Sequence, residues 1–446
     1  MNPLKTAVVG HTNTGKTSLL RTLLRDDAFG EVQNAAATTR HVEEAAIGAG
    51  GETLLLLYDT PGLEDAGGLL DWLEEHTSSR EEGIDRIRRF LDSDAAAEAF
   101  SQEAKVLRQL LASDCGLYVI DAREPVLPKY RDELTVLSWC AKPLMPVFNF
   151  TRGSDTDAWR QMLARRNLHV SSSFDTVAFD FEGEMRLWQN LATMLPGRDS
   201  LSRLAASRRD DWQALDRQAR QSIASFLLDA AACRRVLDDP LQAESAQAQM
   251  QQQVRDGEAV LQRELLDLYR FYRSRTDSSH APLNAFRRDP FDSELLKEYG
   301  IRTGTGAAAG ALIGLGVDAL TLGTSLGMGA AIGGLIGGVL PNWQTLSDKI
   351  SGTETLYIDA AALTLLAARS LELLAQLQSR GHAGSGDILL EGGRAPWQPE
   401  KLPTPLQRAR RHPEWSSCNP EGDGHSSSRA GAQADLAAVL KNAATA

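Results

Sequence analysis

Gly10, Gly15, Lys16 and Thr17 have the types and spacing of a phosphate-binding loop, G-x-x-x-x-G-K-[ST]. Glycines let consecutive backbone N–H groups turn inward around phosphate oxygens, and the helix that follows points its positive end at them. Lys16 would contact the β and γ phosphates of a nucleotide, and the Thr17 hydroxyl would bind Mg²⁺. A predicted strand precedes the loop and a predicted amphipathic helix follows it. The sequence therefore predicts a site for a nucleoside triphosphate.

Two further segments would complete the site around Mg²⁺ and the third phosphate. Asp59 ends a predicted strand and would hold Mg²⁺ through water, while Gly62 in the same Asp-Thr-Pro-Gly turn would bring its N–H to the γ phosphate. This turn is common by itself, but here it follows the phosphate loop by about 40 residues. Thr38–His41 lies between the two segments. A threonine there would complete the Mg²⁺ shell only when the γ phosphate is present, which predicts an order–disorder switch.

The elements that must position these residues alternate along the first 198 residues. Short apolar runs alternate with amphipathic stretches, which is typical of an α/β domain with a mostly parallel sheet and helices on both faces. A helical arm is predicted as an insertion at about residues 64–113. The predicted strands are Lys5–Val9, Leu54–Tyr58, Gly116–Ile120, Leu144–Phe150 and Thr176–Phe179.

The composition changes after residue 198, which predicts three further regions. Residues 199–300 read as an all-α region and a connector, with a break near Pro240. Residues 301–380 contain a glycine-rich segment and an apolar helix predicted at Glu354–Arg380. Residues 381–446 are rich in Gly, Ser, Pro and Arg, so we expect a mostly disordered tail.

The motifs GHTNTGKTSL, TTRH and DTPGL, in this order, resemble those of the Era and TrmE branch of the translation-factor-related GTPases. The resemblance covers about the first 150 residues, and the helical, glycine-rich second half is similar to that of bacterial Era-like GTPases with a C-terminal domain of unknown function. It implies GTP and GDP as ligands, Mg²⁺ as cofactor, and Thr39 as the Mg²⁺-sensing threonine, with Thr38 as the alternative. The Mg²⁺ ligands expected are thus Thr17, Thr39 and Asp59. The nucleotide contacts expected in the loop are Gly10, Asn13, Thr14, Gly15, Lys16, Thr17 and Ser18.

The residues for hydrolysis differ from those of Ras-like enzymes. Leu63 stands where a glutamine would orient the attacking water, and leucine cannot hydrogen-bond to water. Asn13 occupies the position at which some relatives coordinate a K⁺ ion that replaces an arginine finger; the alternative is that Asn13 only stabilises the turn. The expected catalytic residues are Lys16, Asn13, Thr39 and Gly62, with slow turnover that K⁺ or a partner stimulates.

The segment expected to bind the base departs from the family pattern. GTPases have Asn-Lys-x-Asp, in which the aspartate binds guanine, and this chain has Asn149-Phe150-Thr151-Arg152. Arginine cannot accept hydrogen bonds, so Asp155 or Asp157 would have to substitute for the aspartate. Guanine specificity therefore follows from the resemblance alone. Val177–Asp180 is the expected last loop on the base side.

The glycine-rich segment admits two interpretations. Ala319–Leu340 is an uncharged run of 22 residues, and about 20 suffice for a helix to cross a bilayer. Its small-x-x-x-small spacing would let helices approach closely in lipid. The alternative is a buried helical hairpin that packs on the apolar helix after it. The segment 301–380 is the expected contact for a membrane or protein partner.

Composition narrows the functions further. A net charge of −12, from 47 basic and 59 acidic residues, disfavours nucleic acid as a partner. Four widely spaced cysteines predict reduced thiols, and the N-terminus has no secretory signal. We expect a cytoplasmic GTPase switch, located peripherally or inserted at the inner face of the membrane if the glycine segment enters lipid. The alternatives are a nucleotide-driven membrane-remodelling or tethering protein and a scaffold that binds nucleotide without hydrolysis. A second copy of the chain, in a nucleotide-dependent dimer, is a further partner to consider.

Overall fold

The computed structural model describes residues 2–25, 29, 42–176, 180–195, 199–237, 240–269, 288–301, 313–317, 354–379, 393–419, 422 and 427–444. The chain divides into two compact units, which are described separately. The first comprises Met1–Trp212 with Arg273–Arg275 and Gln378–Ser385; the second comprises Gln213–Tyr272, Thr276–Leu377 and Gly386–Ala446. The boundary after Trp212 falls inside helix α8 (Asp199–Ala232), later than the change in composition at residue 198 suggested.

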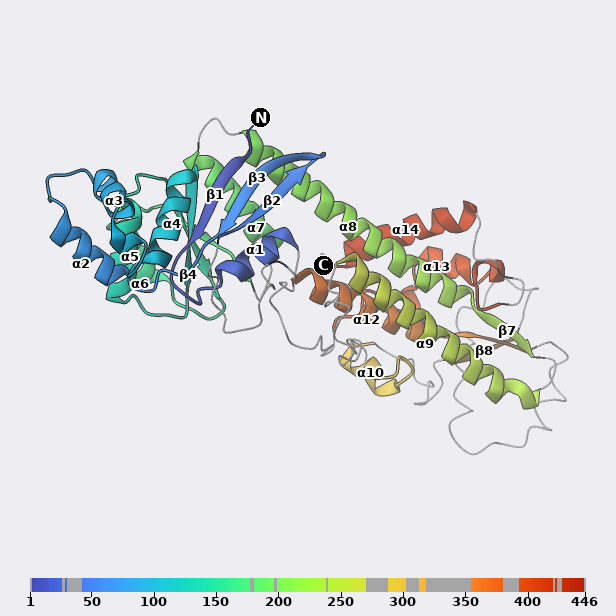
Figure 1. The fold of residues 1–446 in the computed structure, drawn as a ribbon. Coiled ribbons are helices and arrows are strands. Elements are labelled where there is room, and N and C mark those ends of the chain that lie inside the picture. The colour runs from blue at the N-terminus through green and yellow to red at the C-terminus, as the bar shows by residue number, and fades with distance from the viewer. Residues whose placement is uncertain are drawn as a thin grey trace. The chain divides into compact units, whose positions relative to one another are not determined.

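A six-stranded sheet organises the first unit, in the order β2-β3-β1-β4-β5-β6. Figure 1 labels the first four strands of this order, β2, β3, β1 and β4. All neighbouring strands are parallel except β2 and β3, which form an antiparallel hairpin. The predicted α/β fold with a mostly parallel sheet is therefore confirmed. The strands are β1 (Leu4–Val9), β2 (Glu43–Ala49), β3 (Glu52–Asp59), β4 (Cys115–Asp121), β5 (Leu144–Asn149) and β6 (Ser172–Ser173).

Two strands differ from the sequence prediction. Strand β2 was not predicted, because its sequence EEAAIGA is rich in Glu and Ala, which rarely favour strands. It forms because Ala45 and Ile47 alternate inward while β3 supplies the partner strand. The last strand among the described residues lies at Ser172–Ser173, where no strand was predicted. Of the strand predicted at Thr176–Phe179, residues 177–179 lie outside the described residues.

Helices cover both faces of this sheet, and each face has its own apolar core. One core contains Leu19 of α1, Leu187 of α7 and Leu201 at the start of α8. The other contains side chains from α2 to α6, among them Leu69 and Phe90. The segment between β3 and β4, where the helical arm was expected, holds α2, α3 and α4. The helices are α1 (Lys16–Leu24), α2 (Ala66–His76), α3 (Gly83–Leu91), α4 (Ser101–Ala112), α5 (Pro128–Ser138), α6 (Asp157–Ala164) and α7 (Phe181–Met194).

The second unit is mainly helical but also contains a three-stranded antiparallel sheet in the order β7-β9-β8. The prediction of an all-α region was therefore wrong on this point. The break expected near Pro240 is a short 3₁₀ turn between β7 and α9. The elements are β7 (Arg234–Leu237), α9 (Ala243–Leu268), α10 (Ser293–Glu298), β8 (Ile313–Val317), β9 (Glu354–Ile358), α12 (Ala360–Ser379), α13 (Thr404–Ala409) and α14 (Ser427–Ala444).

The glycine-rich segment is described only at Ile313–Val317, which form strand β8 paired with β9 rather than a helix. The run Ala319–Leu340, for which a membrane helix or a hairpin was predicted, lies outside the described residues. The apolar helix predicted from Glu354 begins only at Ala360, because Glu354–Ile358 pairs as β9. Asp359 then accepts a hydrogen bond from the Ala361 N–H at 2.7 Å and caps the helix.

Within the part of the chain that the structure describes, α12 is the one helix long and apolar enough to cross a membrane. In the structure, 72% of the most apolar 18-residue stretch of α12 is buried, as is typical of a core helix in a globular domain. In the middle of α12, Arg369 forms a buried ion pair with Glu258 of α9 at 2.9 Å. A helix that carries a paired charge into a protein core is better explained by packing than by lipid.

The prediction of a mostly disordered tail was wrong for residues 404–419 and 427–444. This region forms α13, a 3₁₀ turn at Pro413–Trp415 and α14. The composition of this region predicted disorder, but a few apolar side chains are enough to pack these helices. Those that are buried include Leu406, Trp415, Ala432, Leu436 and Leu440.

Candidate functional site

The phosphate loop connects β1 to α1 and depends on its two glycines. Gly10 has φ 141° and Gly15 has φ 89°, conformations that side chains disfavour. A Cβ atom at Gly10 would lie 2.6 Å from the Val119 carbonyl oxygen, and one at Gly15 would overlap the Asn149 side chain. Asn13 also has a positive φ, 65°, which asparagine tolerates better than most residues, and it is exposed. The loop is thus a cradle of main-chain atoms that larger residues would fill.

Lys16 lies inside this loop with 7% of its surface exposed. Its Nζ donates to the carbonyl oxygens of Gly10 at 3.2 Å and His11 at 2.8 Å. Burial lowers the pKa of Lys16 from 10.5 to about 8, although the negative charge of Asp59 opposes this shift. The loop therefore holds one ammonium group at the place where phosphate oxygens would bind.

The two predicted Mg²⁺ ligands that the structure describes lie together. The Thr17 hydroxyl donates to Asp59 Oδ2 at 2.6 Å, and the Asp59 side chain is buried. The parallel pairing of β1 with β3, which sets Val8 opposite Asp59, brings the carboxylate to the loop. A hydroxyl and a carboxylate beside an ammonium-lined cradle are hard oxygen donors that fit Mg²⁺ bound to a phosphate chain.

Hydrogen bonds fix the Asp-Thr-Pro-Gly turn and the residue after it to β1 and to the phosphate loop. The Thr60 hydroxyl donates to the Val8 carbonyl at 2.7 Å, and the Leu63 N–H donates to the Gly10 carbonyl at 3.2 Å. A Cβ atom at Gly62 would lie 2.6 Å from Thr12 Cα, so only glycine fits there. The Leu63 side chain is buried in the core.

Glu103 of α4 holds the residues that follow this turn, and sequence reasoning missed it. Its Oε1 accepts hydrogen bonds from the N–H groups of Glu64 at 3.1 Å and Asp65 at 3.0 Å. Glu103 is buried on a helix face that also buries Ala104 and Leu107. An acidic residue on an otherwise apolar helix face was the signal that could have identified it.

A second buried glutamate contacts the phosphate loop from α5. Glu133 Oε1 lies 2.7 Å from His11 Nδ1, and its Oε2 accepts the Tyr118 hydroxyl at 2.8 Å. On the other side of the imidazole, Lys129 Nζ lies 2.9 Å from His11 Nε2. Nothing in the local sequence around His11 predicts its two partners, which both come from α5.

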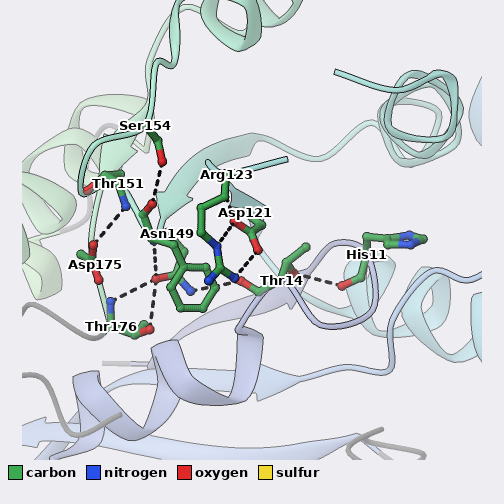
Figure 2. Close-up of polar contacts among 10 residues, drawn as sticks. His11, Thr14, Asp121, Arg123, Asn149, Thr151, Ser154, Asp175 and Thr176 are labelled. Carbon is green, nitrogen blue, oxygen red and sulfur yellow. Dashed lines mark hydrogen bonds and ion pairs between the residues drawn. The ribbon is translucent and has the colours of Figure 1, made fainter. Parts of the chain in front are cut away.

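Asn149 connects the base side of the site to the phosphate loop (Figure 2). Its side chain is buried, and its Nδ2 donates to the Thr14 carbonyl at 3.1 Å. Its Oδ1 accepts from the N–H of Thr176 at 3.0 Å and from the Thr176 hydroxyl at 3.1 Å. The one residue of the base motif that this chain retains therefore links three loops.

Phe150 and Arg123 form a stacked pair beside Asn149. The Arg123 guanidinium lies 4.0 Å from the centre of the Phe150 ring. Asp121 fixes the arginine by accepting from Nε at 2.9 Å, and from its terminal nitrogen at 2.7 Å (Figure 2). Phe150 has φ 56°, an unusual conformation for an aromatic residue. The pair presents a flat surface of the kind on which a base stacks.

The structure gives Asp155 a local role. It is exposed, and its Oδ1 accepts from the Asp157 N–H at 2.9 Å just before α6. Among the described contacts, none joins Asp155 to Asn149 or Phe150. Asp175 does reach the motif, because its Oδ2 accepts from the Thr151 N–H at 3.0 Å (Figure 2).

Two predicted parts of the site lie outside the described residues. These are the switch segment with Thr38 and Thr39, and most of the expected base-side loop, Val177–Phe179. Thr14 is buried and its hydroxyl donates to the His11 carbonyl at 3.0 Å, while Ser18 lies in the first turns of α1. Of the predicted site residues that it describes, the structure brings Asp59, Gly62 and Asn149 to the phosphate loop.

Comparisons with known proteins agree with this geometry. Residues 5–150 match the family model described as 50S ribosome-binding GTPase. The tRNA modification GTPase MnmE of Enterococcus faecalis is 34% identical over 118 residues, which cover 26% of this chain and 23% of that protein. The same protein of Acholeplasma laidlawii is 40% identical over 86 residues, which cover 19% of this chain and 17% of the relative. The chain thus spans less than a quarter of the length of these curated relatives.

Solved structures with a similar chain path include Era in complex with MgGDPNP and nucleotides 1506–1542 of 16S ribosomal RNA. It has 19% identity and a TM-score of 0.31, and the match covers 44% of this chain and 58% of that one. The G domain of the T. maritima FeoB iron transporter has 17% identity and a TM-score of 0.26, with 44% and 100% covered.

The second half of the chain has its own match. Residues 160–438 match the model described as a domain of unknown function, DUF3482. The resemblance predicted from the motifs, a GTPase domain of the Era and TrmE type followed by a C-terminal domain of unknown function, is confirmed. This match covers more than half of the 446 residues, and the chain belongs to the DUF3482 family.

Proposed function

We propose that the protein is a Mg²⁺-dependent molecular switch that binds and hydrolyses GTP. The observation that carries the proposal is the Lys16 ammonium inside a glycine cradle, next to the Thr17–Asp59 pair at 2.6 Å. The Lys16 ammonium can bind phosphate oxygens, and the Thr17 hydroxyl and Asp59 carboxylate can bind Mg²⁺. This combination suits a nucleoside triphosphate better than an uncharged ligand. The GTPase family match of residues 5–150 supports the same class of ligand.

The residues of the loop would act mainly by binding and orientation. The Lys16 ammonium would exchange the carbonyl oxygens of Gly10 and His11 for β and γ phosphate oxygens. Thr17 would hold Mg²⁺ directly and Asp59 through water, and Thr39 would join them when the γ phosphate is bound. When bound, Mg²⁺ would supply positive charge that stabilises the negative charge of the phosphate chain. The Gly62 N–H would contact the γ phosphate from the other side.

Hydrolysis is expected to be slow without a further group. Leu63 is buried in the core and offers no hydrogen bond to an attacking water. We propose that K⁺, held with the help of Asn13, supplies part of the missing charge stabilisation. The exposed position and positive φ of Asn13 leave its side chain accessible for this role. A partner protein that inserts a cation would do the same.

Recognition of the base is proposed to favour guanine only modestly. Phe150 and Arg123 provide stacking, which every base accepts. The exposed Arg152 replaces the carboxylate that would bind guanine, and Asp155 is occupied with the Asp157 N–H. We therefore expect a smaller difference in affinity between GTP and ATP than an Asn-Lys-x-Asp enzyme shows.

One set of binding measurements tests the proposal. GTP, ATP, GDP and ADP are titrated with Mg²⁺ into the purified protein in K⁺ buffer and in Na⁺ buffer, and phosphate release is followed in parallel. We expect tighter binding of GTP than of ATP, and phosphate release that Lys16→Ala abolishes. Absence of binding by all four nucleotides would overturn the proposal. Binding of GTP without release above the Lys16→Ala background would leave a non-hydrolysing scaffold.

The K⁺ prediction needs its own comparison. We expect phosphate release to rise several-fold in K⁺ over Na⁺ at equal ionic strength, and Asn13→Ala to remove this difference. Thr135→Ala, a substitution of a partly exposed residue on α5, serves as the control. Equal rates in both salts, with Asn13→Ala unchanged, would contradict the prediction.

For location and partners, we propose action in the cytoplasm with residues 301–380 as the contact for a membrane, a protein or a second copy of the chain. Burial of α12 argues against this helix as the membrane anchor. Fractionation of the expressed protein with and without detergent tests membrane attachment. Recovery only in the soluble fraction without detergent would exclude it.

A further inference from the structure

Two thiols far apart in the sequence lie together in the second unit. Cys233 follows the C-terminal end of α8 and is buried. Cys418 lies in the segment Pro413–Asn419, here called the tail turn, and is partly exposed. The Cys233 thiol forms a hydrogen bond with the Cys418 sulfur. Both are free thiols, so the structure shows a reduced pair rather than a disulfide.

Asn419, the residue after Cys418, fixes the position of the tail turn relative to Cys233. Asn419 Nδ2 donates to the carbonyl oxygen of Ala232 at 2.9 Å, and its Oδ1 accepts from the Arg234 N–H at 3.0 Å. These are the two chain neighbours of Cys233. One side chain therefore brackets Cys233 on both sides and holds Cys418 next to it.

Asp229, one helical turn before Cys233, anchors the tail turn a second time. Its Oδ1 accepts from the N–H of Ser417 at 2.8 Å and from the Ser417 hydroxyl at 3.1 Å. Its Oδ2 accepts the Cys418 thiol at 3.4 Å. The Trp415 side chain is buried at the start of the turn. Contacts before, at and after Cys418 thus fix its position without any covalent bond.

We propose that Cys233 and Cys418 are a modification site that forms a reversible intramolecular disulfide when the protein meets a peroxide. The Cys418 thiolate attacks one peroxide oxygen, the O–O bond breaks, and sulfenic acid and hydroxide result. The Cys233 sulfur then attacks the Cys418 sulfur, and its proton leaves with the sulfenic hydroxyl as water. The peroxide takes up two electrons in total, and a dithiol reductant reverses the reaction.

The order of the two steps follows from accessibility and acidity. The hydrogen bond from Cys233 lowers the pKa of the Cys418 thiol, although the Asp229 charge opposes this. The same contact, together with burial, raises the pKa of Cys233. The partly exposed Cys418 is therefore the better thiolate, and the buried Cys233 resolves it. Burial raises the pKa of Cys140 to about 12, so that thiol is a suitable unreactive reference.

The test uses the full-length reduced protein and hydrogen peroxide. We expect oxidation to remove two of the four thiols without a dimer on non-reducing gels, and dithiothreitol to restore them. Mass spectrometry of the digest should find the Cys233 and Cys418 peptides joined, with a mass two hydrogens lower than the sum. This measurement needs no variant, so a substitution that fails to fold leaves the proposal testable.

Single substitutions sharpen the result. Cys418→Ser should abolish the loss of thiols, and Cys233→Ser should leave Cys418 as sulfenic or sulfinic acid. The matched control Cys140→Ser should still form the link. Four thiols retained after peroxide, or Cys418 oxidised beyond sulfenic acid in the native protein without the cross-link, would overturn the proposal. A cross-link between Cys418 and any other cysteine would overturn it as well.

Discussion

Lys16 carries the positive charge of the phosphate site in surroundings that make the charge depend on pH. Burial lowers its pKa to about 8, so the free protein loses much of this charge in mildly alkaline solution. A bound triphosphate needs the ammonium form. We therefore expect the affinity for nucleotide to fall as pH rises through about 8, by up to about tenfold per pH unit. Titration with a fluorescent GDP analogue between pH 6.5 and 9.5 measures this dependence.

The stability of the free protein should change in the opposite direction. Because the folded pKa lies below the unfolded value of 10.5, the unfolded chain binds more protons between about pH 8 and 10.5. The contribution of Lys16 to the free energy of unfolding therefore rises with pH over that interval. An affinity independent of pH from 7 to 9 would show that Lys16 keeps its charge in the free protein.

At the scale of elements, α4 matters because Glu103 holds the chain just after the Asp-Thr-Pro-Gly turn. Glu103→Ala removes the acceptor of two N–H groups, at Glu64 and Asp65. We expect phosphate release at saturating GTP to fall about tenfold, equivalent to about 1.4 kcal/mol. We expect GDP affinity to change little, because the phosphate loop is untouched. Single-turnover phosphate release and GDP titration measure the two effects.

Two comparisons separate positioning from general loss of structure. Glu103→Gln keeps an acceptor oxygen and should recover part of the rate, whereas Glu98→Ala, an exposed change in the same insertion, should have no effect. If Glu103→Ala reduced GDP affinity and phosphate release equally, Glu103 would have only a structural role and would not position the turn for hydrolysis.

At the scale of the whole molecule, the buried pair of Arg369 and Glu258 joins α12 to α9 in the second unit. Arg369→Met leaves the Glu258 carboxylate buried opposite an apolar side chain. We expect the free energy of unfolding of this unit to fall by about 3–5 kcal/mol, and the double change with Glu258→Gln to recover much of it. Urea unfolding followed by circular dichroism measures both, with Arg263→Met, exposed on α9, as the control.

The pH dependence of this variant has a definite sign. Burial already raises the pKa of Glu258 in spite of Arg369, and removing the arginine raises it further. A carboxyl group with a raised folded pKa favours the folded state below its unfolded pKa, and this stabilisation disappears as pH rises through the folded pKa. Arg369→Met should therefore be closest to the wild type in acid. If the decrease in the free energy of unfolding did not vary with pH, lost packing and not the unpaired charge would account for it.

The sequence predicted the parts of the site that are local along the chain. Gly10, Gly15, Lys16 and Thr17 lie within eight consecutive residues, so spacing alone identifies them. Spacing could not identify Glu103 and Glu133. Each lies on a helix far from the phosphate loop in the sequence, and only the packing of that helix brings the side chain to the site. The tail was misjudged for the same reason, since its order comes from contacts such as that of Asn419 with the end of α8.

The contacts of Asn149 separate the assembly of the candidate site from the expected selection of a base. Its amide joins the phosphate loop to Thr176, while the positions next to it, Phe150 and Arg152, differ from the guanine-binding pattern. Substitutions of Phe150 or Arg152 should therefore alter any preference among purines and leave the link between the two loops intact.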